Sequence, residues 1–250
     1  MTIQSEARVD AAPARVAAEP TASRWEDYID IFISPASVFR RRRSGGVTHP
    51  IVTLAVSSFV LYFIMLPGNM RAFQRSAPTP EATAFMEQWG LLFQVAGGLF
   101  TPVMVLLAVT FAAVMLSIVC SVLSVQIAFK DTFLIAAYAA FIYLLSTAVI
   151  GLVTMIKGGA IDPVRDLSFG VLRFTGADGM SPPVATLLKE IDLFAIWQAI
   201  LWGIGLRVIG NASRLQAFAA DSLAWILVPL PGILISTLAR TPPMTAPPPS

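Results

Sequence analysis

The feature that most constrains this chain is the absence of charge from five long windows. No Asp, Glu, Lys or Arg occurs in 44–70, 88–129, 132–156, 193–206 or 222–239, which together make up about half of the chain. Charged residues are 13% of the whole, against ~25% in a typical soluble domain. A soluble fold of this size cannot cover so much uncharged chain, because its surface needs polar groups. The pattern predicts an all-α integral membrane protein, a bundle of about five transmembrane helices.

The five uncharged windows predict the membrane spans, and one of the windows allows an alternative number of crossings. Pro67-Gly68-Asn69 is expected to end the first span, and Pro229 and Pro231 interrupt the last. The block 90–129 is preferred as one long helix, kinked at Pro102, whose start lies outside the hydrocarbon core. The alternative is that this block crosses twice, which gives six spans and moves the C-terminus to the other side. The predicted transmembrane domain is 44–240, with spans at about 50–66, 95–127, 132–156, 187–208 and 215–238.

The segment 23–43 is predicted to be an amphipathic helix followed by a basic cluster. Trp25, Tyr28, Ile29, Phe32 and Ile33 recur at helical spacing on one face. Ser23 and Glu26 fit a capping box, and Ser34-Pro35 stops this helix and suits the start of another. One interpretation places the segment on the membrane surface; the other packs it on the protein's own cytoplasmic face. In the first, the lipid contacts are Trp25, Tyr28, Phe32, Arg40, Arg41, Arg42 and Arg43.

The tails and the charges complete the organisation. Residues 1–22 and 241–250 are predicted to be disordered, because they lack large apolar groups or are Pro-rich. Basic residues near the membrane ends favour a cytoplasmic N-terminus and an external C-terminus. Charged residues at these span ends also predict a cytoplasmic polar cluster. The alternative is that they anchor the helix ends at the membrane interface, with a local Arg–Asp pair between neighbouring helices. The cluster consists of Lys130, Arg207, Arg214 and Asp221.

Small residues recur at helical spacing in two spans and predict close helix packing. Small side chains let backbones approach closely in lipid, where packing replaces the hydrophobic effect between helices. A second interpretation, that the Ser/Thr ridge of the second span lines a polar conduit, is open but less favoured. The expected packing residues are Ala113, Ser117, Ser121, Ala195, Ala199 and Gly203.

Composition leaves little room for catalysis. The chain has one cysteine, Cys120, and one histidine, His49, which excludes a Cys-based zinc site and paired-His metal motifs. It has no Gly-x-Ser-x-Gly elbow and no Walker A loop. We therefore expect no catalytic residues, no metal and no cofactor. The net charge of +2 also gives no nucleic-acid footprint.

Several segments resemble the Yip (Ypt-interacting protein) domain family, especially its bacterial members. They are Ile191-Asp192-Leu193-Phe194-Ala195-Ile196-Trp197 with its continuation to Leu206, Ser34-Pro35 through Phe39, Phe129-Lys130-Asp131 with Ile135 to Tyr138, and Ala217 to Trp225. The resemblance covers about 25–238. It implies a five-span bundle with a cytoplasmic N-terminus. Eukaryotic relatives bind small Rab-type GTPases, but their Asp-Leu-Tyr-Gly-Pro segment is absent here, so the resemblance does not extend to GTPase binding.

These observations predict a non-enzymatic membrane protein that organises membrane lipids or protein partners, itself included. The rival function is a small-molecule or lipid transporter or channel, favoured by spans interrupted at Pro102 and at Pro229/Pro231. The preference for Arg over Lys, 14 to 3, suggests a GC-rich bacterial genome and hence a bacterial inner membrane.

Overall fold

The computed structural model describes residues 23–75, 79–157, 168–175, 180, 182–189 and 191–238. The tails predicted to be disordered, 1–22 and 241–250, lie outside these residues. Within the described part the elements are all helical: α1 (Asp27–Ile33), α2 (Pro35–Arg42), α3 (Thr48–Arg75), α4 (Pro80–Val122), α5 (Phe129–Lys157), α6 (Leu172–Thr175), α7 (Pro182–Lys189), α8 (Leu193–Val208), α9 (Arg214–Leu227) and α10 (Leu230–Leu238).

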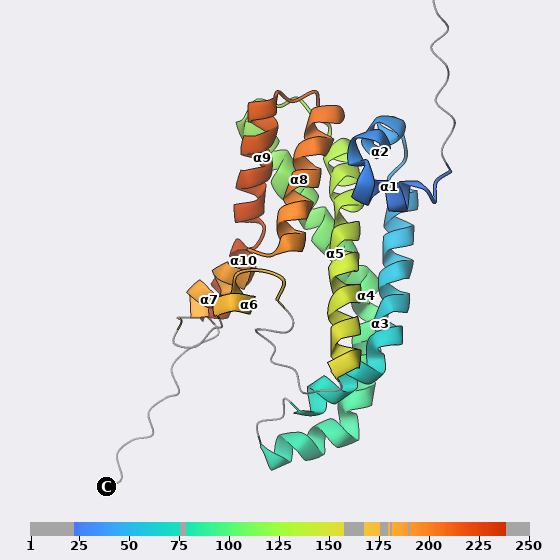
Figure 1. The fold of residues 1–250 in the computed structure, drawn as a ribbon, viewed down its shortest axis with the longest axis vertical. Helices are drawn as coiled ribbons and strands as arrows, with labels where there is room; N and C mark the ends of the chain where they lie inside the picture. Colours follow the sequence, from blue (N-terminus) through green and yellow to red (C-terminus); the bar gives the residue numbers. More distant parts are fainter. Residues whose placement is uncertain are drawn as a thin grey trace, which may run out of the picture.

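Three long helices form the body of the molecule. α3, α4 and α5 pack against one another along their length, and α8 packs on α5 while α9 packs on α8 and α4. The short helices α1 and α2 lie at one end, against α5 and α8 (Figure 1). α6, α7 and α10 lie beside one another lower down, below α8 and α9 (Figure 1). The buried core runs through α4, α5, α8 and α9 at the end that carries α1 and α2.

The first two predicted spans are each one continuous helix. α3 does not end at Pro67-Gly68-Asn69 as expected but continues to Arg75. α4 has 43 residues and includes Pro102, so the block 90–129 does not turn back on itself. A helix of that length measures about 64 Å, roughly twice the ~30 Å hydrocarbon core. Its first turns therefore extend beyond a membrane, as the preferred interpretation requires.

The last two predicted spans are each broken into two helices. Asp192 separates α7 from α8, because its carboxylate accepts hydrogen bonds from Phe194 N and Phe169 N, both at 2.9 Å. This cap starts a new helix and ties the segment before α6 to it. α9 ends at Leu227 and α10 begins at Leu230, on either side of Pro229. The two breaks leave α8 with 16 residues and α9 with 14.

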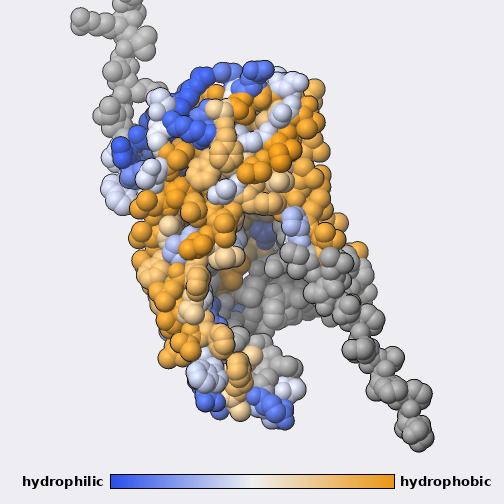
Figure 2. Space-filling model, turned by 180° about the vertical axis from the view of Figure 1, so that it is seen from behind, coloured by the Kyte–Doolittle hydropathy of each residue, from blue (hydrophilic) through white to orange (hydrophobic). Residues whose placement is uncertain are grey.

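Four described segments are long and apolar enough to cross a membrane: one each in α3, α4 and α5, and Arg214–Leu234, which runs through α9 into α10; α8 is a shorter apolar helix. α8 has 16 residues and is about 24 Å long. Figure 2 shows hydrophobic side chains along the flank and hydrophilic ones gathered at the end where α1 and α2 lie. The prediction of an all-α membrane bundle is confirmed.

Candidate functional site

The helix α1 has two apolar faces rather than the single one that the sequence suggested. Ile31 is fully buried, and Tyr28 and Phe32 pack partly against the core. Trp25, Ile29 and Ile33, by contrast, are 71%, 64% and 77% exposed. Ile29 and Ile33 lie one turn apart on α1, and Trp25 lies in the turn that leads into it; spaced every fourth position, the three form what we call the outer ridge. α1 is thus docked on the bundle while a line of large apolar groups remains uncovered.

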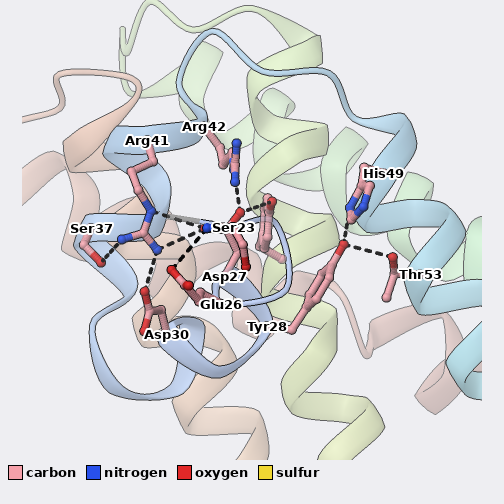
Figure 3. A network of polar contacts seen from close by, with 11 residues as sticks. Ser23, Glu26, Asp27, Tyr28, Asp30, Ser37, Arg41, Arg42, His49 and Thr53 are labelled. Atoms are coloured by element: carbon pink, nitrogen blue, oxygen red, sulfur yellow. Dashed lines mark hydrogen bonds and ion pairs between the residues drawn. The ribbon is translucent and has the colours of Figure 1, made fainter. Parts of the chain in front are cut away.

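A buried carboxylate holds α1 and α2 in place. Asp27 is completely inaccessible to solvent, and its carboxylate accepts hydrogen bonds from Arg41 Nη2 at 3.0 Å and Arg42 Nε at 2.5 Å. Arg41 Nη2 also reaches Asp30 Oδ2 at 2.6 Å. The Tyr138 hydroxyl on α5 donates to Asp27 Oδ2 at 3.5 Å. We call these residues the Asp27 network; Figure 3 shows its members from α1 and α2 converging.

A second polar contact ties α1 to the start of α3. The Tyr28 hydroxyl lies 2.9 Å from Thr53 Oγ1 and is also hydrogen-bonded to His49 Nδ1 (Figure 3). The Tyr28 and His49 rings stack with centroids 5.7 Å apart. The lone histidine of the chain is therefore a structural partner of Tyr28, and it lies in the first turn of α3.

The electrostatics of these contacts favour a fixed attachment of α1 and α2 to the bundle. Burial opposes the charged form of Arg41, but hydrogen bonds to Asp30 and Asp27 outweigh it and raise the pKa of the guanidinium. Burial also raises the pKa of the Tyr28 hydroxyl. Both side chains therefore stay protonated at physiological pH, and neither supplies a base. A charge buried with matched partners fixes one geometry of the two short helices on the bundle.

The four consecutive arginines have different surroundings. Arg41 and Arg42 point into the Asp27 network, whereas Arg40 and Arg43 are exposed and make no ion pair with the residues described. The interpretation that all four face headgroups therefore needs correction for Arg41 and Arg42, whose charges are already matched. Lys130, Arg207 and Arg214 are exposed at the same end of the bundle. Together with Arg40 and Arg43 they form what we call the basic rim.

Asp221 does not join the basic rim. Its carboxylate accepts hydrogen bonds from the backbone N–H and hydroxyl of Ser222 and lies where α8 and α9 meet. A Cβ added to Gly203 would come within 2.5 Å of Asp221 Oδ2. The expected Arg–Asp pair with Arg207 or Arg214 is absent among the described ion pairs.

The predicted packing residues are divided between interfaces and exposed surface. Ala113 is fully buried, and the Ser117 hydroxyl lies 2.6 Å from Thr132 Oγ1 on α5. Gly203 is buried at the crossing of α8 and α9, and Ala195 and Ala199 are partly buried on the same helix. Ser121 is exposed. The Ser/Thr ridge of α4 therefore forms a helix contact at Ser117 but is not a continuous interface.

A cavity of about 610 Å³ opens between the long helices. Its walls come mainly from α3, α4 and α5, with Gln198 and Trp202 from α8. Met104 and Tyr143 line it and are largely exposed, so the cavity opens sideways on the flank, where Figure 2 shows the molecule hollowed. No Asp, Glu, Lys, Arg or His lies among the described residues that line it.

Sequence reasoning missed the Asp27 network and the cavity. Asp27 lies between apolar positions of α1, and that placement was the available signal for a buried charge. Nothing in the sequence marked Tyr138 as its partner across 111 positions. The described residues contain no group of acidic, His or Cys side chains that could hold a metal ion.

The family follows from a match to most of the chain. The model of the Yip1 domain matches residues 29–235, which includes every helix from α2 to α9. The chain belongs to the Yip1 domain family. No curated protein and no solved structure matches it. It is therefore an integral membrane protein of the Yip type, as the resemblance implied.

Proposed function

We propose that this Yip-type protein is a non-enzymatic organiser of the bacterial inner membrane. In this proposal its α1–α2 cap, meaning helices α1 and α2 together, contacts lipid or a membrane partner on the cytoplasmic side. The observation that carries the proposal is the outer ridge. Trp25, Ile29 and Ile33 remain exposed although the other side of α1 is anchored to the bundle. Exposed apolar groups in a line, beside cations, suit the boundary between headgroups and acyl chains.

The charge at this end supports the orientation. The basic rim gathers Arg40, Arg43, Lys130, Arg207 and Arg214 around the ends of the helices. Positive residues close to span ends accumulate on the cytoplasmic side, and each contributes about 1 kcal/mol of attraction to an anionic leaflet. These charges support a cytoplasmic cap next to anionic headgroups. We propose a second copy of this chain or another membrane protein as the partner, and we do not propose small GTPases.

The test uses the full chain reconstituted in lipid nanodiscs. A bimane fluorophore is attached at Ile33→Cys in a Cys120→Ala background, with Ser44→Cys, exposed in the loop after α2, as the matched control. We expect lipids brominated near the headgroup to quench the fluorophore at position 33 strongly and the one at position 44 weakly. Anionic lipid should enhance the quenching, and salt should reduce it. Equal, weak quenching at both positions would refute contact between the outer ridge and lipid.

Transport of an apolar solute is the second candidate function. The sideways-open cavity of about 610 Å³ favours it, since interrupted membrane helices often border substrate sites. Its test is movement of a fluorescent neutral lipid between the leaflets of proteoliposomes. A rate above that of protein-free liposomes, abolished when the cavity is filled by Ala140→Phe, would support transport. A rate equal to that of protein-free liposomes would refute it.

A further inference from the structure

The cavity has the size and shape of a site for a chain-like molecule. On α3 its lining runs from Leu54 to Asn69, a rise of about 22 Å along the helix axis. The hydrocarbon part of one leaflet is about 15 Å thick, half of a ~30 Å core. The volume of about 610 Å³ lies within the ~300–1,000 Å³ of small-molecule sites. The cavity is therefore long, narrow and parallel to the helices.

The walls of the cavity favour an uncharged occupant. The hydroxyls of Ser58, Thr101, Thr147 and Thr154 donate to carbonyls of their own helices. The Tyr62 hydroxyl donates to Gln94 on α4. These groups are satisfied and present mostly carbon to the cavity. Because none of the described residues that line it is charged, a buried ionic headgroup would find no countercharge among them.

Two residues of α8 that line this cavity, Gln198 and Trp202, carry polar groups with no hydrogen-bond partner among the described residues. Trp202 is 3% exposed, and its Nε1–H is buried without a hydrogen bond. Gln198 precedes it by one helical turn on the same face, also lines the cavity, and makes no side-chain hydrogen bond with the described residues. Buried donors are normally paired. The indole N–H is closed off from solvent, so the Gln198 carboxamide is the group that suits a ligand with its own hydrogen-bond acceptor.

We propose that the cavity binds one molecule of an uncharged, chain-like lipid that carries a carbonyl group. The lipid enters sideways past Met104 and Tyr143, the exposed side chains of α4 and α5 that line the cavity. Its chain lies along α3, and its carbonyl oxygen accepts a hydrogen bond from the Gln198 amide. Diacylglycerols and prenyl quinones share this chemistry, and an ionised fatty acid does not.

The experiment is native mass spectrometry of the full chain, titrated in detergent with dioleoylglycerol, decylubiquinone and oleate. We expect one neutral molecule per chain from at least one of the first two probes, and weaker or no binding of oleate. Dioleoylglycerol alone would indicate a glycerolipid, and decylubiquinone alone would indicate a quinone. No adduct with either neutral probe, or oleate bound as tightly as they are, would overturn the proposal.

Variants locate the bound molecule. Gln198→Leu removes one hydrogen bond and should weaken binding about threefold to tenfold. Gln126→Leu is the matched control, because Gln126 is exposed and does not line the cavity. Equal weakening by Gln198→Leu and Gln126→Leu would contradict the assigned anchor.

Filling the space gives a second test of location. Ala140→Phe places a ring in the cavity and should abolish binding, whereas Val103→Phe, at an exposed position of α4 that does not line the cavity, should leave binding unchanged. Ala140→Leu serves if the larger ring lowers the melting temperature of the protein. Unchanged binding in a folded Ala140 variant would place the ligand elsewhere and overturn the proposal.

Discussion

Replacing Asp27 with asparagine should release the α1–α2 cap from the bundle. The substitution keeps the shape of the side chain but removes the charge that two guanidinium groups share at 3.0 and 2.5 Å. Breaking a buried ion pair by removing one partner costs about 3–5 kcal/mol. Arg41 and Arg42 are partly exposed, with 19% and 24% of their side-chain surface accessible, and Arg41 keeps Asp30. We therefore expect a loss near the lower limit, about 3 kcal/mol of docking free energy.

The fraction of molecules in which the α1–α2 cap is undocked from the bundle measures this loss of docking free energy. A loss of about 3 kcal/mol raises that population roughly 100-fold. Val38 on α2 is fully buried, so Val38→Cys in a Cys120→Ala background reacts with a maleimide only when the cap opens. Ser44→Cys gives the intrinsic rate. Asp27→Asn should accelerate labelling at position 38 roughly 100-fold, while Asp30→Asn, which leaves both contacts of Asp27, should accelerate it less than about tenfold.

Equal labelling rates in Asp27→Asn and the parent would show that the Asp27 network adds nothing to docking. If Asp27→Asn does not yield folded protein, Arg42→Gln replaces it, and the Arg42→Gln/Asp30→Asn pair measures whether the two contacts are independent. Labelling at position 44 must stay constant throughout, because that loop position is exposed whether or not the cap is docked.

Three further predictions concern packing and pH. Gly203→Ala brings a Cβ within 2.5 Å of Asp221 Oδ2, so it should lower the melting temperature in detergent, and Asp221→Ala should restore it; no restoration would refute the α8–α9 contact. Ser117→Ala should cost about 0.6 kcal/mol through its lost bond to Thr132, and Ser121→Ala, at an exposed site, should cost nothing measurable in unfolding experiments. Because burial raises the pKa of Tyr28 from 10.0, its stabilisation is complete below about pH 10 and is lost as pH rises through the folded pKa. Melting temperatures should therefore fall less steeply above pH 10 in Tyr28→Phe than in the parent; identical curves would exclude this residue as a cause.

The positions of the helices could be predicted from the sequence where one local signal dominates. Ser34 does precede a helix with Pro35 in its first turn, because a fixed backbone angle and a missing N–H suit that place. Pro67 was predicted to end its helix, but α3 continues past it and packs on α4 and α5 along its length. Tertiary packing overrode the local preference there.

The α1–α2 cap could be predicted only in part. Helical spacing identified the apolar residues of this segment, but it placed them on one face, whereas the structure divides them between the bundle and the outer ridge. That division depends on Asp27, whose burial is possible only because two arginines and Tyr138 meet it. Such a long-range charge match leaves no periodic trace in one sequence. The cavity is equally invisible, since it is defined by where three helices separate.

The number of membrane crossings is the most direct test of this architecture. Four described segments are long enough to span the membrane, namely those in α3, α4 and α5 and the stretch Arg214–Leu234. The helix α8, with 16 residues, is a shorter fifth candidate. If α8 crosses, the chain makes an odd number of crossings and its ends lie on opposite sides. Reporters fused before Thr2 and after Ser250, each assayed in cells for cytoplasmic or external activity, measure this. The five-span account predicts a cytoplasmic N-terminus and an external C-terminus. Because α4 is one continuous helix, two cytoplasmic ends would mean an even number of crossings, in which either α8 or the segment Arg214–Leu234 does not cross, and this would contradict the account.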